Sequence, residues 1–172
     1  MVPRHHLVRD FQVGGEDKQM IIELDLDNPE ILKEIYELQR AAYLKEAELI
    51  DFYAIPPLRE TMQELKACGE TFWGYFEDEQ LTGAISCTIA DHELTICRMV
   101  VNPDHFRKGI AQKLLTKVEE ANLDISVFNV STGKDNLPAK NLYLKNGYHF
   151  VTDLEVVPGL YISNFKKKKT PS

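Results

Sequence analysis

Residues 99–120 read MVVNPDHFRKGIAQKLLTKVEE: an apolar strand, a basic turn with one glycine, and then a helix with an apolar stripe formed by Ile110, Leu114, Leu115 and Val118. The first amide groups of a helix have no partner inside the helix, and the helix dipole is positive at that end. Gly109 and Ala111 carry little side chain, so a phosphate group could approach the backbone closely. Arg107 and Lys108 would add positive charge. This order predicts a phosphate-binding turn, although an ordinary strand–turn–helix with an exposed basic pair explains the same spacing equally well.

Two segments of the chain together resemble a known enzyme family. Residues 101–103 (VNP) followed by residues 106–111 (FRKGIA) resemble motif A of the GNAT N-acetyltransferase superfamily. Residues 136–148 (NLPAKNLYLKNGY) resemble its motif B, and the two motifs stand in the family's order and at its usual separation. The resemblance covers roughly residues 20–165 and implies an α/β fold, a mixed central β-sheet flanked by helices on both faces. One departure is Phe106, which stands where the family often has Gln or Arg, so the contact of that polar side chain would be lost.

The resemblance also implies a cofactor and a set of site residues. Acetyl-CoA would be the co-substrate, with its pyrophosphate held by a loop that consists of Phe106, Arg107, Lys108, Gly109, Ile110 and Ala111. The backbone of Met99, Val100 and Val101 would pair with the pantetheine arm, as an added strand pairs with a sheet edge. Asn136 would contact the cofactor from motif B, and Tyr143 would be the general acid that protonates the departing sulfur. Without motif B, the residues alone favour Tyr143 as a packing residue beside Leu142.

The general base is left open by the sequence. Some members of the family use a glutamate in the strand before motif A, but Thr95 stands at that position here. The carboxylates that remain are one on the same strand and three in the two N-terminal helices: Glu93, Glu46, Glu48 and Glu60. A water relay without a dedicated base is an equal alternative. His92 and His105 lie beside the relevant elements, but histidines in such positions are more often surface residues.

Composition is typical of one globular domain. The chain has 172 residues, of which 44% are hydrophobic and 27% charged. It has no apolar run long enough to cross a bilayer and no signal-peptide pattern, so a cytoplasmic location is expected. The three cysteines, Cys68, Cys87 and Cys97, lack the spacing of a disulfide framework or a zinc site, and no metal is expected. Cys97 lies near the proposed ligand strand, so a cysteine nucleophile has to be considered, but a buried structural thiol is its expected role.

The formal net charge of −7 disfavours nucleic-acid binding, which rests on neutralising phosphates. It is compatible with a cationic acceptor such as a small-molecule or peptide amine, although acidic surfaces usually serve solubility. No membrane partner is expected, and whether the protein is a monomer or a homodimer is left open.

The chain divides into a loose extension (1–19), an acetyltransferase domain (20–165) and a basic flexible tail (166–172). Helices are expected at 29–50, where Asn28 is the cap, at 58–67 and after Asn136; strands are expected at 20–24, 71–77, 81–90, 93–101, 125–130, 148–152 and 160–165. The strand at 93–101 is apolar on two faces, with Leu94, Ile96 and Val100 expected on one and Cys97, Met99 and Val101 on the other. Arg98 interrupts this strand; contact with a ligand is one alternative, but it is expected to be buried and paired, or to reach water with its head group.

These observations predict an acetyl-CoA-dependent N-acetyltransferase in which a primary amine attacks the thioester directly, because no nucleophile–base pair is visible. A transferase for a longer acyl group and a non-catalytic acyl-CoA-binding module remain as alternatives. A nucleotide-binding kinase would need a Gly-x-x-x-x-Gly-Lys-Ser/Thr loop, which the chain lacks. The acceptor, whether a polyamine, an amino sugar, an antibiotic, a peptide N-terminus or a lysine, cannot be read from the sequence.

Overall fold

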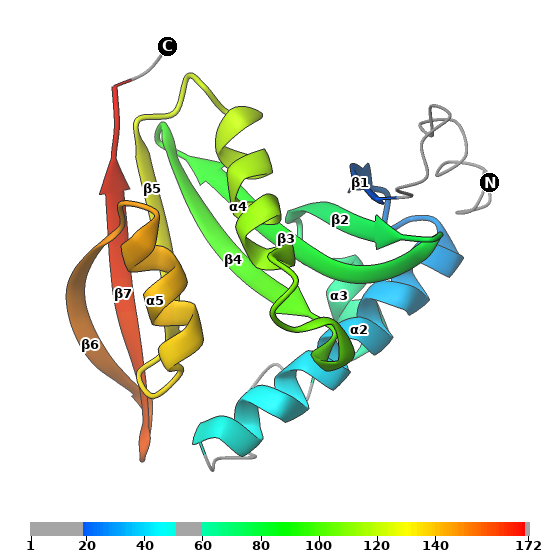
Figure 1. Ribbon diagram of the computed structural model, residues 1–172, viewed down its shortest axis with the longest axis horizontal. Coiled ribbons are helices and arrows are strands. Elements are labelled where there is room, and N and C mark those ends of the chain that lie inside the picture. Colours follow the sequence, from blue (N-terminus) through cyan, green and yellow to red (C-terminus); the bar gives the residue numbers. More distant parts are fainter. Residues whose placement is uncertain (1–18, 51–59, 171–172) are drawn as a thin grey trace.

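The computed structural model describes residues 19–50 and 60–170, and its centre is a seven-stranded sheet in the order β1-β2-β3-β4-β5-β7-β6. The strands are β1 (Gln19–Leu24), β2 (Thr71–Glu77), β3 (Gln80–Ala90), β4 (Glu93–Val101), β5 (Val127–Gly133), β6 (His149–Val157) and β7 (Leu160–Lys168). The helices are α2 (Pro29–Ile50), α3 (Met62–Lys66), α4 (Ile110–Glu120) and α5 (Leu137–Lys145), with a short 3-10 turn, η2 (Pro103–His105). Figure 1 shows α2 and α3 on one face of the sheet and α4 and α5 on the other. The predicted mixed α/β architecture is therefore confirmed.

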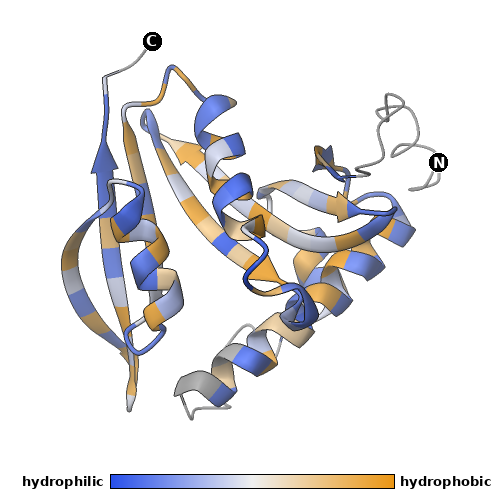
Figure 2. Ribbon diagram, viewed as in Figure 1, coloured by the Kyte–Doolittle hydropathy of each residue, from blue (hydrophilic) through white to orange (hydrophobic). Residues whose placement is uncertain are grey.

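Two hydrophobic cores, one on each face of the sheet, hold the layers together. Figure 2 shows orange, apolar segments along β4 and on α2. The first lies under α2 and α3 and includes Ile31, Ile35 and Leu65, whereas the second lies under α4 and α5 and includes Leu114 and Phe128. Within the described residues no helix is both long enough and apolar enough to span a bilayer. The predicted extension at residues 1–19 lies, apart from Gln19, outside the described residues.

Side-chain caps set where the helices begin. The Asn28 side chain accepts a hydrogen bond from the Glu30 amide at 3.0 Å and starts α2, which runs to Ile50 as predicted. The second helix is shorter than the predicted 58–67. It starts at Met62 because Thr61 and Glu64 form a reciprocal capping box, in which each side chain bonds the other's backbone amide. Residues 58 and 59 of the predicted helix lie outside the described residues.

A β-bulge in β4 corrects the predicted faces of this strand. Ser86 pairs with Arg98 and Cys87 with Ile96, which leaves Cys97 as the extra residue. An extra residue shifts the alternation of side chains by one. Leu94 and Ile96 consequently face α4 and α5, while Val100 lies in the core under α2; the prediction that these three share one face is wrong.

The last three strands differ in length from their predictions because they extend one another through pairing. β7 pairs with β5 from Ile162↔Gly133 to Lys168↔Val127, and with β6 from Leu160↔Val157 to Lys166↔His149. The basic tail was expected to begin at residue 166, yet residues 166–168 belong to β7. The Lys167 ammonium lies 2.9 Å from the Glu119 carboxylate at the end of α4, and this contact holds the basic run on the sheet.

Candidate active site

The centre of the sheet forks between β4 and β5. These parallel strands pair from Glu93↔Val127 to Ile96↔Val130, and the described pairing stops there. Beyond this point β4 continues to Val101 paired with β3 alone, through Met99↔Ile85, Val100↔Ala84 and Val101↔Gly83. Figure 1 shows the two strands separating toward their carboxyl ends. The fork leaves the β5-facing backbone groups of Met99, Val100 and Val101 as an edge to which an extended ligand could pair.

The turn that follows β4 carries the features expected of an anion site. Gly109 has φ of 75° and caps α4 without a side-chain hydrogen bond. The first hydrogen bond of the helix runs from the Lys113 amide to the Gly109 carbonyl at 3.1 Å, so the amides of Ile110, Ala111 and Gln112 point out of the helix end. The first turn carries no acidic residue that would compete with an anion. Arg107 also has a positive φ, 70°, which is strained for a residue with a Cβ.

Gly83 on β3 allows this helix end to lie close to the sheet, and sequence reasoning missed it. A Cβ atom built on Gly83 would lie 2.6 Å from the Ile110 side chain and 3.2 Å from Leu114. Only glycine fits between β3 and the first turn of α4. A glycine inside an apolar strand was the available signal, because such residues often mark close approach of another element.

The basic residues of the turn differ in their surroundings. Lys108 Nζ lies 3.3 Å from Glu77 at the end of β2, and His105 Nδ1 lies 3.2 Å from the same carboxylate. Although burial opposes the charge, the hydrogen bond from Lys108 and the nearby His105 lower the pKa of Glu77. Glu77 thus attaches the turn to the β2–β3 hairpin, a contact that no local pattern indicates. Arg107 is exposed, and Phe106 is 45% exposed.

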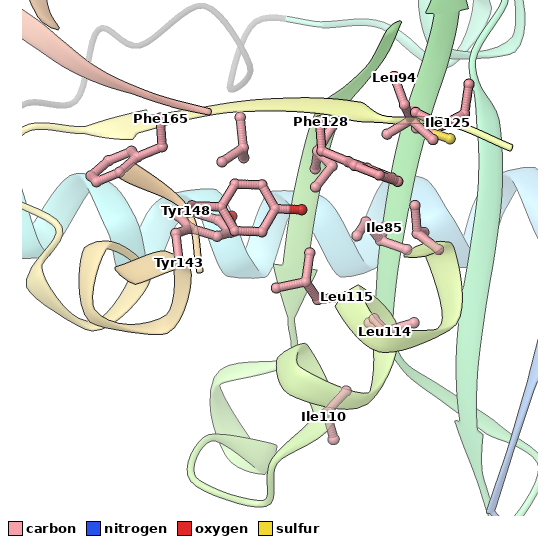
Figure 3. Close-up of a cluster of buried hydrophobic side chains, with 14 of the residues drawn as sticks. Ile85, Leu94, Ile110, Leu114, Leu115, Ile125, Phe128, Tyr143, Tyr148 and Phe165 are labelled. Atoms are coloured by element: carbon pink, nitrogen blue, oxygen red, sulfur yellow. The ribbon is translucent and has the colours of Figure 1, made fainter. Parts of the chain in front are cut away.

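Motif B forms α5. The Asn136 side-chain oxygen accepts a hydrogen bond from the Ala139 amide at 3.2 Å and caps this helix; its contact with a cofactor stays a prediction. Tyr143 is 2% exposed, and its ring centroid lies 5.8 Å from that of Tyr148 and 6.0 Å from that of Phe165 (Figure 3). The same core cluster includes Val130, the last β5 residue paired with β4. Motif B therefore places Tyr143 on the buried face of α5, in the core beside the fork.

The four carboxylates considered as general base lie in different environments. Glu93, at the start of β4, accepts a hydrogen bond from the side-chain nitrogen of Asn129, Nδ2, at 2.9 Å. Glu48 is exposed and pairs with Lys45 at 3.3 Å, and the Glu46 side chain lies outside the described residues. Although burial would raise the pKa of Glu60, hydrogen bonds from Arg98 and Gln39 hold it below its usual range, which makes this carboxylate a weak base.

Cys97 differs from its expected role. It is exposed at the β4 bulge, not buried. Its sulfur lies 3.7 Å from the Thr88 hydroxyl, and partial burial of the thiol raises its pKa. A thiol with a raised pKa is a poor nucleophile at neutral pH, so direct attack by the acceptor remains the simpler chemistry. Within residues 19–50 and 60–170 no cluster of three or more His, Cys, Asp or Glu side chains is arranged to hold a metal ion.

Acid should selectively remove the stability that Glu60 contributes. Its pKa is lower in the folded chain than the ordinary value of 4.5, so the contribution is present above that value and disappears as the pH falls through the lowered one. We expect Glu60→Gln to be less stable than the wild type near neutral pH, and the difference to shrink below about pH 4.5. Urea unfolding at several pH values measures it. Glu48→Gln, at an exposed carboxylate, is the matched control, and an equal pH dependence in the two variants would contradict the assignment.

Comparisons with known proteins agree with this geometry. A model of the acetyltransferase (GNAT) family matches residues 32–148. The chain is 42% identical over 135 residues to UPF0157 protein YqkA of Bacillus subtilis, a match that covers 78% of this chain and 39% of that protein. The chain thus spans about two fifths of the length of this curated relative.

Solved structures of acetyltransferases share the fold. The PaiA N-acetyltransferase of Thermoplasma acidophilum, in complex with coenzyme A, superposes with a TM-score of 0.71 at 20% identity over 88% of this chain and 99% of that one. The ribosomal-protein-S18-alanine N-acetyltransferase of Escherichia coli gives 0.70 at 14% identity, over 87% and 93%. YncA of Salmonella typhimurium, a putative acetyltransferase with acetyl-CoA as its cofactor, gives 0.67 at 17% identity, over 90% and 98%. With its seven-stranded mixed sheet, its two motifs and a family match over most of its length, the chain belongs to the GNAT acetyltransferase family.

Proposed function

We propose that the protein is an acetyl-CoA-dependent N-acetyltransferase that acts on a primary amine. The observation that carries this proposal is the fork between β4 and β5 together with the α4 helix end that follows it. The fork offers a strand edge for the pantetheine arm, and the amides of Ile110, Ala111 and Gln112 offer donors for the pyrophosphate. The coenzyme A and acetyl-CoA complexes of two structural relatives support the same cofactor.

The proposed reaction runs in one ternary complex. The neutral amine nitrogen attacks the thioester carbonyl carbon, and the negative charge that develops on the oxygen is stabilised by backbone donors of β4. The carbon–sulfur bond then breaks, and the electron pair leaves with sulfur as a thiolate. Tyr143 donates its phenolic proton to that thiolate, the amine nitrogen loses a proton to water or a carboxylate, and that proton restores the Tyr143 phenol for the next turnover. The products are an amide and coenzyme A.

The acceptor is proposed only by class. A net charge of −7 favours approach of a cationic amine, whether a small molecule or a peptide. The three free cysteines are compatible with the reducing cytoplasm that we propose as the location.

Acetyl-CoA should raise the thermal stability of the chain. A ligand that binds only the folded state at a hundredfold excess over its dissociation constant stabilises it by about 2.7 kcal/mol. For a domain of this size, that corresponds to a rise in Tm of several degrees. Thermal unfolding with and without the cofactor measures the effect, with dephospho-CoA and free pantetheine as comparison ligands. An unchanged Tm and no heat of binding in calorimetry at millimolar cofactor would overturn the proposal.

Turnover tests the enzymatic half of the proposal. A panel of primary amines is incubated with acetyl-CoA, and the released thiol is measured. At least one amine should give an acetylated product in an amount equal to that of the released thiol. Cofactor binding without turnover on any amine of the panel would favour a non-catalytic acyl-CoA-binding module. Faster turnover with longer acyl-CoA thioesters would instead assign a different acyl donor.

A further inference from the structure

Arg98 on β4 has every donor of its guanidinium engaged. Its Nε donates to Glu70 Oε1 at 2.8 Å, and Nη1 donates to Gln39 Oε1 at 2.9 Å and Glu60 Oε1 at 2.6 Å. Nη2 donates to Glu60 Oε2 at 2.8 Å and Glu70 Oε2 at 3.2 Å. A guanidinium has five N–H groups in a fixed planar fork, so this arrangement uses its full capacity. The expected pairing of this arginine is confirmed, its side chain is mostly buried at 12% exposed, and the group has no donor left for a ligand.

The partners of Arg98 are themselves fixed. Gln39 is 1% exposed and donates from its amide nitrogen to Glu60 Oε1 at 2.7 Å, and the Ser86 hydroxyl donates to Glu70 Oε1 at 2.6 Å. The Phe72 ring lies under the guanidinium, and its centroid is 5.6 Å from Arg98 Cζ. Burial opposes the charge, yet hydrogen bonds with both carboxylates raise the pKa of Arg98 above its ordinary value. Geometry and charge thus hold the side chain in one position.

These contacts join β4 to three segments of the face covered by α2 and α3. Gln39 belongs to α2, Glu60 immediately precedes the cap of α3, and Glu70 immediately precedes β2. Arg98 therefore attaches β4, the strand proposed to pair with the cofactor, to the layer of α2 and α3.

The position of this attachment along β4 coincides with the fork. Ile96 is the last β4 residue paired with β5, Cys97 is the bulge, and Arg98 is the next residue. Pairing of β4 with β5 therefore ends at Ile96, and two residues later Arg98 bonds β4 to the layer of α2 and α3. Pairing with β3 continues through this region, but it does not fix where β3 and β4 lie together relative to β5.

We propose that Arg98 is a positioning residue that fixes the fork of the sheet, and with it the strand edge of Met99–Val101 that receives the pantetheine arm. The inference rests on the proposed function, since it concerns the binding of that cofactor. It predicts that weakening the contacts of Arg98 lowers cofactor affinity, although neither Arg98 nor its partners are among the residues assigned to cofactor binding.

Arg98→Lys tests the proposal without changing charge. The ammonium has three donors on a flexible stem and cannot reproduce five bonds in one plane, while the positive charge near the anionic cofactor is retained. We expect the Kd for coenzyme A, measured by calorimetry, to rise about fivefold, within the range of couplings transmitted through packed networks. Ile35→Val, a truncation at a fully buried position of α2, is the control for lost stability, and it should leave Kd unchanged.

Glu70→Gln provides a second test that separates positioning from electrostatics. Removing a negative charge would by itself strengthen binding of an anionic cofactor, whereas a weakened attachment should reduce it. A higher Kd in Glu70→Gln therefore supports the positioning role, even where Arg98→Lys fails to fold. Wild-type affinity in folded Arg98→Lys and in Glu70→Gln would overturn it. A wild-type protein that binds no coenzyme A would overturn the proposed function itself.

Discussion

Tyr143→Phe should reduce turnover by about 10²-fold while leaving cofactor binding nearly unchanged. The substitution keeps the ring, which is 2% exposed and packs against Tyr148 and Phe165, and removes only the hydroxyl. General acid catalysis contributes about 10²- to 10⁴-fold, and a thiolate leaves readily enough to place the effect at the lower end. The measurement is kcat with the best acceptor, at a pH where chemistry limits the rate.

Tyr148→Phe is the matched control for this prediction. Tyr148 is 1% exposed in the same cluster, and its hydroxyl donates to Glu119 at 3.0 Å, which is a structural contact. Removing it should lower stability and leave kcat close to that of the wild type. An unchanged kcat in Tyr143→Phe would make Tyr143 a packing residue and leave the thiolate to be protonated by water.

Gly109→Glu should weaken acetyl-CoA binding by tenfold or more, which corresponds to about 1.4 kcal/mol. The new carboxylate would lie at the N-terminus of α4, where the exposed amides and the helix dipole are expected to receive the pyrophosphate. Like charges close together repel, and the side chain would occupy the space in front of the helix end. Isothermal titration of coenzyme A into the folded variant gives the Kd.

Two substitutions separate this effect from backbone strain. Gly109→Gln has nearly the same shape without the charge and should lose less affinity than Gly109→Glu. Gly69 has φ of 76° against 75° at Gly109, and a Cβ at either position meets nothing within 4 Å. Gly69→Gln should therefore lose about the same stability as Gly109→Gln, roughly 1 kcal/mol, without loss of affinity. Wild-type affinity in Gly109→Glu would show that the phosphate loop is assigned to the wrong segment.

The positioning role proposed for Arg98 is indirect, unlike the roles proposed for these two residues. Tyr143 and the turn at Gly109 would act on the cofactor directly, whereas Arg98 would act through the path of β4. The three can be distinguished. Substitution of Tyr143 should change kcat, whereas substitution of Arg98 or Gly109 should change Kd, and at Gly109 the effect should depend on the charge of the introduced side chain.

Local chemistry allowed the sequence by itself to determine several parts of this protein. The strand–turn–helix of residues 99–120, the caps at Asn28 and Asn136, and the bounds of β2 and β4 all follow from neighbouring residues: apolar periodicity, side-chain caps and turn-forming residues. The two motifs identified the family for the same reason, because each is a continuous stretch whose spacing can be read directly.

Contacts between distant residues were decided only by the tertiary structure. Arg98 is 59 residues from Gln39, and Lys167 is 48 residues from Glu119, so no local pattern records either bond. The bulge at Cys97 depends on how β3 aligns with β4, and the length of β7 depends on two neighbouring strands. Strand register and ion pairs depend on which buried polar groups find hydrogen-bond partners at the same time when the layers pack. The sequence therefore determined where the turn before α4 lies along the chain, and the packing decided what holds β4, the strand before that turn, in place.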